Sequence, residues 1–170
     1  IPFGTIVRDM PHGEEVPALS FAAVADSSGG VALLNDSKHG HAFSHGELSL
    51  TLIRSSYDPD ILPEIGQHSI RCALLGFSGS PDPTDLARRA AAFNRPLTVV
   101  NTDAHEGALP PAGAFVTLDS DRAVLSAVKT AERSDALVVR LYNPADEETT
   151  AVVGLGGGLG AVDSCTLVDF

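Results

Sequence analysis

The sequence predicts an all-β protein, a β-sandwich with one short helix between two sets of strands. Three observations support this prediction. Short apolar runs recur through the 170 residues, many at the spacing of about 8–12 residues that is typical of sandwiches and barrels. Clusters of Gly, Pro, Asp and Ser separate these runs. Only one segment, rich in Ala and Arg, has the composition of a helix.

The first half of the chain contains six candidate strands. In order, they are Phe3–Arg8, Pro17–Val24, Val31–Leu34, His39–Ser44, Glu47–Arg54 and His68–Phe77. Turn residues at 26–30 and 44–46 separate several of them. Because strands with short connections usually pair, we expect Val31–Asn35 and Glu47–Arg54 to be antiparallel neighbours.

Two of these strands have predicted core faces. Leu48, Leu50 and Leu52 alternate with Ser49, Thr51 and Ile53, which is the period-2 pattern of a half-buried strand. Arg54 continues the leucine face, and an unpaired guanidinium is costly to bury. The strand must therefore end there, or Arg54 must meet a carboxylate or a polar cleft. In the later strand we expect a core face of Ile70, Cys72 and Leu74.

Ser78–Pro83 is the best candidate boundary, since Gly, Pro and Ser dominate it. A helix is expected within Asp82–Phe93, capped by Asp82 or Thr84 and stopped at residues 94–96. The later strands are expected at Leu97–Val100, Ala114–Asp119, Ala123–Thr130, Ala136–Tyr142, Thr149–Leu155 and Cys165–Phe170. The predicted organisation is a sandwich portion at 1–78, a linker and helix at 79–95, and a small β domain at 96–170.

The net charge of −11 disfavours nucleic acid and anionic membranes as partners, because phosphate binding needs clustered Lys and Arg. No apolar run is long enough to cross a membrane. The chain has no initiator Met or signal peptide and opens abruptly at Ile1, so we expect it to belong to a longer protein. Cys72 and Cys165 can pair only if the fold brings them together; a reducing, cytoplasmic compartment is expected, with Cys72 in the core.

His39 and His41 lie two apart on a predicted strand, with His45 in the following turn. Two imidazoles on one strand face could share a zinc ion, with the third nearby. The alternative, which the absence of further ligand motifs favours, is that they are surface or inter-domain histidines. The sequence therefore predicts no metal site in this chain.

No catalytic residue is assigned from the sequence. Asp58, Asp60 and Glu64 occupy one Pro-containing loop without an apolar pocket, so we expect them to be solvated. The glycine-rich run 154–160 fits a loose dinucleotide pattern, but no helix and parallel strand can follow it, which indicates a flexible loop.

An ordered set of short motifs resembles bacterial α-mannosidases of glycoside hydrolase family 38. The first group is V-A-L-L-N-D-S-K-H-G-H at 31–41, L-S-L-T-L-I-R-S-S at 48–56, D-P-D at 58–60 and G-Q-H at 66–68. The second group is F-N-R-P-L at 93–97, S-A-V-K-T-A-E at 126–132 and V-R-L-Y-N at 139–143. Each motif alone is weak, whereas their order along the chain is fairly specific.

The resemblance implies a fold, an activity and partners. The resemblance implies that the whole enzyme uses an aspartate nucleophile and a zinc ion. Both would belong to an N-terminal barrel that this sequence does not contain. This chain would then be the non-catalytic C-terminal β portion, with no cofactor of its own. It would pack on that barrel and meet mannose-containing oligosaccharides at the active-site rim. The substrate-binding candidates are Arg54, Asp36 and His39; family members often carry Tyr at positions 39 and 41.

Two other functions remain open, a free-standing carbohydrate-binding sandwich and an interaction domain without a small ligand. Sugar-binding modules usually display aromatic platforms, and the chain has no Trp and only two Tyr. Mannose titration separates the binding module from the other hypotheses. Unpaired strand edges and uncovered apolar surface also predict self-association of the isolated chain, with Phe3–Arg8 as a strand that could pair between copies.

Overall fold

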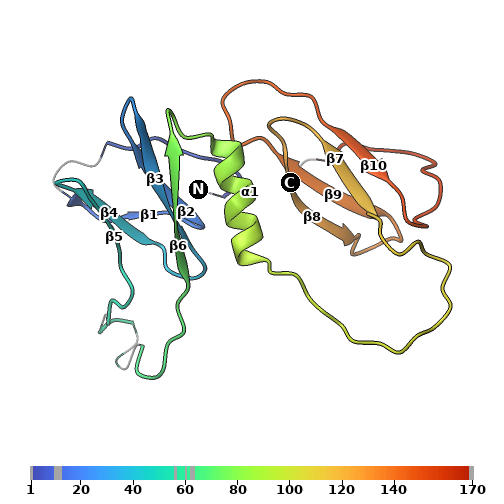
Figure 1. The fold of residues 1–170 in the computed structure, drawn as a ribbon, viewed down its shortest axis with the longest axis horizontal. Helices are drawn as coiled ribbons and strands as arrows, with labels where there is room; N and C mark the ends of the chain where they lie inside the picture. The colour runs from blue at the N-terminus through green and yellow to red at the C-terminus, as the bar shows by residue number, and fades with distance from the viewer. Residues whose placement is uncertain (1, 10–12, 56, 60, 62–63, 169–170) are drawn as a thin grey trace.

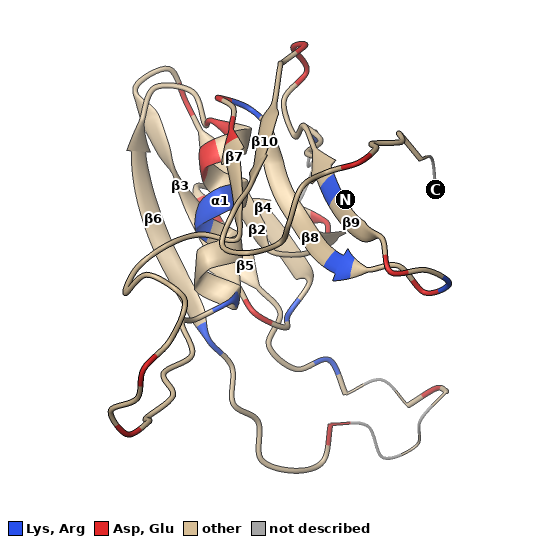
Figure 2. Cartoon of the chain, turned by 90° about the vertical axis from the view of Figure 1, so that its right-hand side faces the viewer, with Lys and Arg blue, Asp and Glu red and all other residues tan. Residues whose placement is uncertain are grey.

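The computed structural model describes residues 2–9, 13–55, 57–59, 61 and 64–168. Strands form most of the regular secondary structure of these residues, and one helix lies between two groups of strands, as Figure 1 shows. The prediction of an all-β sandwich with one short helix is therefore confirmed. Most charged residues belong to loops, turns and the helix rather than to the strands (Figure 2). Among the described residues, no helix is long and apolar enough to cross a membrane.

The N-terminal group contains two antiparallel sheets of three strands each. One has the order β1-β4-β5, with bounds Val16–Pro17, Gly40–Ser44 and Glu47–Leu50. The other has the order β2-β3-β6, with bounds Phe21–Ala25, Gly29–Asn35 and Cys72–Ser78. The expected pairing of Val31–Asn35 with Glu47–Arg54 is wrong, since β3 pairs with β2 and β6 while β5 pairs with β4.

Strand β3 is the centre of this group. Adjacent strand residues point to opposite faces, and Ala32, Leu33, Leu34 and Asn35 are all buried, so both faces of β3 are covered. The β1-β4-β5 sheet lies on one side of it and the helix lies on the other (Figure 1). This position explains the run of apolar residues in β3, because alternation is lost when both faces are buried.

Helix α1 spans Pro83–Asn94 and lies between the two groups of strands. The Asp82 side chain caps it by accepting a hydrogen bond from the Thr84 backbone N–H at 2.8 Å, as the sequence predicts. One face of the helix is buried through Thr84, Leu86, Ala87 and Ala90.

Polar side chains of α1 reach the C-terminal group. Thr84 Oγ1 donates to the Arg122 carbonyl at 3.2 Å, and Arg88 donates to the carbonyls of Ser120 and Ala123 at 2.7 and 2.9 Å. The helix therefore contacts both groups of strands. The division into domains at 78/79 and 95/96 stays a prediction.

The C-terminal group contains two antiparallel strand pairs. Strand β7 (Val116–Asp119) pairs with β10 (Val152–Leu155), and β8 (Val124–Thr130) pairs with β9 (Leu137–Tyr142). Residues 96–115 contain no strand and are exposed, and they form a long loop between α1 and β7 (Figure 1).

Three expected strands are absent. Leu97–Val100 lies in the exposed loop, and 165–168 has no strand partner, while residues 169 and 170 lie outside the described residues. Phe3–Arg8 is not a strand either, because its side chains contact the C-terminal group instead. Phe3 packs edge-on against Tyr142 at 5.7 Å between ring centroids, and Thr5 Oγ1 donates to the Pro144 carbonyl at 2.9 Å.

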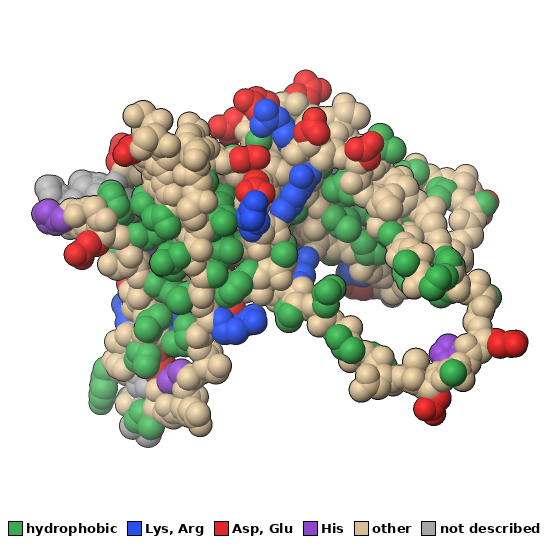
Figure 3. All heavy atoms as spheres, viewed as in Figure 1, with side chains coloured by type: hydrophobic (Ala, Val, Ile, Leu, Met, Phe, Trp, Pro, Cys, Tyr) green, Lys and Arg blue, Asp and Glu red, His purple; other side chains and the backbone are tan. Residues whose placement is uncertain are grey.

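The predicted core face of β6 is reversed. Ala73, Leu75 and Phe77 are the partly buried residues, whereas Cys72 is exposed and Leu74 is 75% exposed. Both sets of alternating residues are mostly apolar, so their hydrophobicity alone could not determine which set faces inward. Apolar side chains accordingly gather on the visible surface of the N-terminal group (Figure 3).

Candidate functional site

A shallow, open groove of about 330 Å³ lies beside the β1-β4-β5 sheet. It brings together the residue before β1, the turn between β3 and β4, and the segment that follows β5. Its lining is mixed in character and consists of Glu15, Val16, Pro17, Lys38, His39, Gly40, Thr51, Leu52, Arg54 and Glu64. Two of the three predicted substrate-binding residues, Arg54 and His39, therefore lie in the same groove, and Asp36 does not.

Arg54 is exposed because β5 ends at Leu50, four residues earlier than expected. Leu52 is 48% exposed, so the leucine face does not continue into the core. A carboxylate does meet Arg54, but at its backbone, since the Arg54 N–H donates to Glu64 Oε2 at 2.7 Å. Among the described residues, no carboxylate forms an ion pair with the guanidinium.

The His39 imidazole is oriented by the backbone that precedes β2. Its Nδ1 lies 3.0 Å from the Leu19 carbonyl oxygen and 3.3 Å from that of Ala18. A carbonyl oxygen can only accept, so Nδ1 carries the proton. The Nε2 side of the ring lies in an exposed position, where it can face a hydroxyl group.

Lys38 and Glu64 form an ion pair at one side of the groove, 3.5 Å from Nζ to Oε1. The Glu64 carboxylate also accepts the Ser55 backbone N–H at 2.8 Å. Hydrogen bonds from the backbone N–H groups of Ser55 and then Arg54, with the charge of Lys38, hold the pKa of Glu64 below its ordinary value. Glu64 is exposed in its loop, as expected, and these contacts give it partners that the sequence did not indicate. Asp60 lies outside the described residues.

On the far side of the groove, Thr51 Oγ1 donates a hydrogen bond to Glu15 Oε2. Glu15 lies against Gly40, where a Cβ atom would approach the carboxylate to 2.6–2.8 Å. The groove thus carries two cationic side chains, Lys38 and Arg54, and two carboxylates that are already engaged with other groups.

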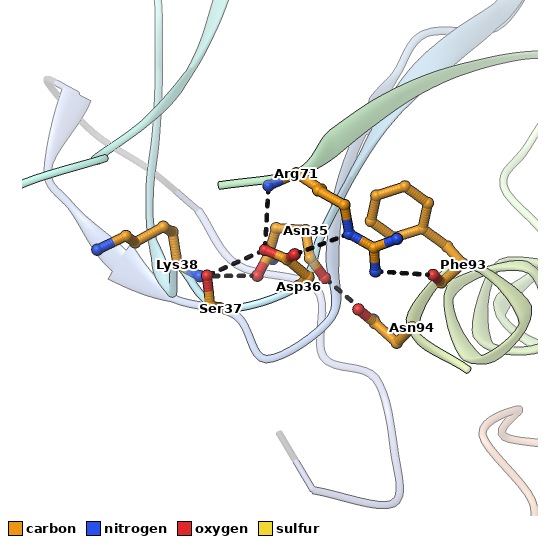
Figure 4. A network of polar contacts seen from close by, with 7 residues as sticks. All are labelled: Asn35, Asp36, Ser37, Lys38, Arg71, Phe93 and Asn94. Atoms are coloured by element: carbon orange, nitrogen blue, oxygen red, sulfur yellow. Dashed lines mark hydrogen bonds and ion pairs between the residues drawn. The ribbon is translucent and has the colours of Figure 1, made fainter. Parts of the chain in front are cut away.

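Asp36 belongs to a separate network that joins β3, β6 and α1 (Figure 4). Its carboxylate accepts from Arg71, whose Nε lies 3.1 Å from Oδ2, and this hydrogen bond is the main reason that the pKa of Asp36 is lowered. The Arg71 guanidinium lies over the Phe93 ring at 5.2 Å and donates to the Phe93 carbonyl at 3.4 Å. Asn94 Nδ2 donates to the Asn35 carbonyl at 3.0 Å. These contacts make Asp36 part of the joint between sheet and helix.

The histidines expected to share one strand face serve different purposes. His41 is 1% exposed, and its Nδ1 donates to the His39 carbonyl at 3.2 Å. Its Nε2 lies 3.5 Å from Asn35 Nδ2, a donor, so the ring is neutral. Burial lowers the pKa of His41. His45 contacts Ser44 at 2.7 Å. In the part of the chain that the structure describes, no three His, Cys, Asp or Glu side chains are grouped to hold a metal ion.

Sequence reasoning missed the other four lining residues with polar side chains, Lys38, Glu15, Thr51 and Glu64. Lys38 stands inside the motif at 31–41, and Glu64 stands between the motifs at 58–60 and 66–68, so the motifs mark their neighbourhood. Glu15 and Thr51 carry no local signal, because they meet only through the pairing of β1, β4 and β5.

Comparison with known proteins agrees with the fold. Residues 1–62 match the family described as "Glycosyl hydrolases family 38 C-terminal domain". Residues 122–169 match "Glycosyl hydrolases family 38 C-terminal beta sandwich domain". The two matches follow one another in the chain and lie on either side of α1, in the two groups of strands.

Several α-mannosidases are similar to the chain. Human alpha-mannosidase 2C1 is 33% identical over 131 residues, 75% of this chain and 12% of that protein. Alpha-mannosidase G of Dictyostelium discoideum is 25% identical over 158 residues, 88% of this chain and 14% of that protein. The alpha-mannosidase of Saccharomyces cerevisiae is 37% identical over 81 residues, 47% of this chain and 7% of that protein. The chain thus spans about an eighth of the length of the first two.

The two family matches, one in each group of strands, define the class of the chain, a C-terminal β region of a glycosyl hydrolase. The chain belongs to glycosyl hydrolase family 38 and corresponds to the C-terminal portion of its α-mannosidases.

Proposed function

We propose that this chain is the non-catalytic C-terminal β portion of a retaining α-mannosidase that removes terminal α-mannose from oligosaccharides, in the cytoplasm. The single observation that supports this most strongly is the pair of ordered family matches across both groups of strands. The family's zinc ion and nucleophile would belong to the catalytic barrel, and no residue of this chain is assigned to either.

The groove would form part of the rim of the active site. Val16, Pro17 and Leu52 offer apolar surface to a pyranose ring. The Arg54 guanidinium offers several N–H donors to hydroxyl oxygens, and Nε2 of His39 can accept from a hydroxyl. Because the exposed guanidinium has no carboxylate partner among the described residues, a sugar would not have to displace one.

The chain would also pack on the catalytic barrel. Large apolar side chains remain exposed on strands of both groups, among them Leu74 at 75% and Val152 at 60%. Exposed apolar surface of this extent is typical of a protein–protein or inter-domain interface. The isolated chain is expected to self-associate through the same surface, which sedimentation velocity over a range of concentrations would measure.

The test uses the intact enzyme that carries this chain. We expect Arg54→Ala to lower kcat/KM for an α-mannoside. The loss of transition-state stabilisation should be about 1–3 kcal/mol, the scale of one lost charge-assisted hydrogen bond. Arg54→Lys should recover only part of the loss, because an ammonium lacks the planar set of donors. Arg133→Ala is the matched control, since Arg133 is an exposed arginine between β8 and β9. If the two alanine variants are equally active, Arg54 does not contact substrate.

A second experiment tests whether the chain is catalytic. The isolated chain is expected not to hydrolyse an aryl α-mannoside, with or without added zinc. Turnover by a pure preparation that disappears on substitution of one carboxylate of this chain would contradict the proposal. Mannose binding by the isolated chain, measured by titration, would instead favour a free-standing carbohydrate-binding module.

A further inference from the structure

We propose that Glu64 is a positioning residue that fixes the backbone from which Arg54 enters the groove. This inference rests on the proposed function, because it concerns how Arg54 is held for a sugar contact. It starts from an unusual feature of Glu64: one carboxylate oxygen, Oε2, accepts the backbone N–H groups of two consecutive residues, Arg54 at 2.7 Å and Ser55 at 2.8 Å.

Glu64 is itself held from two other directions. Its Oε1 lies 3.5 Å from Lys38 Nζ, in the turn between β3 and β4, and the side chains of this pair are only 17% and 28% exposed. Its carbonyl oxygen lies 2.7 Å from His68 Nε2, which must donate because a carbonyl can only accept. Glu64 therefore connects the chain on both sides of the 55–64 loop to the turn that carries Lys38 and His39.

The backbone at both ends of this loop needs such a restraint. Ser55 has φ of 51° and Glu64 has φ of 55°, so two residues with side chains occupy the left-handed region. Conformations of this kind persist when surrounding contacts determine them. Here the Glu64 carboxylate supplies those contacts at Ser55, next to Arg54. The segment 51–55 has left the sheet, so the sheet cannot fix the direction of Arg54.

The arrangement also keeps the charge of Arg54 available. A carboxylate beside an arginine usually pairs with the guanidinium, whereas Glu64 binds the Arg54 backbone and pairs with Lys38. The lowered pKa of Glu64 means that its carboxylate is charged at neutral pH. Glu64 thus fixes Arg54 without neutralising it. The motif at 66–68 agrees with this role, because its His68 donates a hydrogen bond to the Glu64 carbonyl.

The experiment compares variants of the intact enzyme with an α-mannoside as substrate. We expect Glu64→Ala to lower kcat/KM about tenfold or more. Glu64→Gln should recover most of this loss, because an amide oxygen can still accept the two backbone N–H groups. Glu148→Ala is the matched control, because Glu148 is an exposed acid in the loop between β9 and β10, and this variant should match the parent enzyme. Equal melting temperatures would show that the variants are folded.

The double variant Arg54→Ala/Glu64→Ala separates positioning from a general structural effect. If Glu64 acts through Arg54, the double variant should have the kcat/KM of Arg54→Ala alone, within about twofold. A further tenfold loss in the double variant would overturn the inference, and so would full activity of Glu64→Ala.

Hydrogen exchange supplies a readout that does not depend on turnover. The amides of Arg54 and Ser55 should exchange faster in Glu64→Ala than in the parent enzyme, and unchanged exchange would overturn the inference even if that variant were unstable. The outcomes also separate the two proposals. If Arg54→Ala is impaired and Glu64→Ala is not, only the positioning role fails. If Arg54→Ala itself is unimpaired, the sugar contact of the proposed function fails.

Discussion

Asp36 and Arg71 join the end of β3 to the start of β6 by two hydrogen bonds. The Asp36 carboxylate accepts the Arg71 backbone N–H at 3.3 Å and its Nε at 3.1 Å. Because Arg71 also lies over Phe93 and donates to the Phe93 carbonyl at the C-terminal end of α1, one side chain ties two sheet strands to the helix. A cation at this end of a helix also interacts favourably with the helix dipole.

This tie predicts that Arg71→Ala lowers the melting temperature of the chain by a few degrees at most, since exposed ion pairs contribute little. Arg71→Lys should lose nearly as much, because an ammonium cannot reproduce the fork of donors. Thermal unfolding measures both, with Arg133→Ala as control. The lowered pKa of Asp36 sets the pH window: the contribution is present above about pH 3.8 and is lost as the pH falls through the folded-state pKa. No difference from the control would contradict this role.

His41 predicts a second pH dependence at higher pH. Burial lowers the pKa of His41 from 6.5, with a further lowering by His39 and opposing effects from the His39 carbonyl and Glu15. The unfolded chain therefore takes up a proton first as the pH falls below 6.5, and stability declines until the folded-state pKa is reached. Protonation would also set the ring N–H against the Asn35 amide, another donor.

The measurement for His41 is the melting temperature between about pH 7.5 and pH 5. His41→Gln should be less stable at neutral pH, because the buried contact to Asn35 is disturbed. It should also show a flatter dependence over this range than the parent chain. Parallel curves for the two proteins would show that His41 is not the titrating group. His45→Gln, which changes an exposed imidazole, serves as the control.

Truncation to alanine should destabilise the chain strongly at Leu34 and hardly at all at Leu74. Leu34 is 5% exposed in β3, so Leu34→Ala should destabilise the chain by about 2–5 kcal/mol through lost burial and a cavity. Leu74 is 75% exposed on the outer face of β6, and Leu74→Ala should change the free energy of unfolding by less than about 0.5 kcal/mol. Urea unfolding of both variants measures this. A large loss for Leu74→Ala would restore the core face predicted from the sequence.

Both cysteines should react quickly as free thiols in the folded chain. Cys72 and Cys165 are unpaired and exposed, so they do not form a disulfide with each other. A thiol reagent added without denaturant should therefore label both positions at similar, rapid rates, and mass spectrometry would locate the labels. Labelling of Cys72 only after unfolding would contradict its exposed position. Cys72→Ser should leave the stability almost unchanged.

The sequence was most informative where structure depends on near neighbours. The helix was placed to within one or two residues because Asp82, Pro83 and the Ala-rich run act locally. The turn predicted at 44–46 joins β4 to β5, although the pairing of these two strands was not predicted. Pairing between distant strands could not be predicted in this way. Strand β3 pairs with β6 across the long intervening segment, and no turn residue specifies that partner.

The candidate site shows the same division. The resemblance identified Arg54 and His39, which share the groove, but it also included Asp36, whose contacts are with Arg71. The sequence could not predict the groove residues that only the three-dimensional fold brings together. Glu64 is one of three acids in a loop that looks uniformly solvated in the sequence, and its position beside two backbone N–H groups is visible only in the structure.

The contacts between α1 and the C-terminal group have a consequence for how this protein can change over evolutionary time. Thr84, Arg88 and Arg95 all donate to backbone carbonyl oxygens, those of Arg122, Ser120, Ala123 and Ser126. Every residue type supplies a carbonyl, so the strand side of this joint can accept substitutions without losing its acceptors. The helix side cannot, because only particular side chains reach across. Sequence drift should therefore be tolerated at 122 and 126 more readily than at 84 and 88.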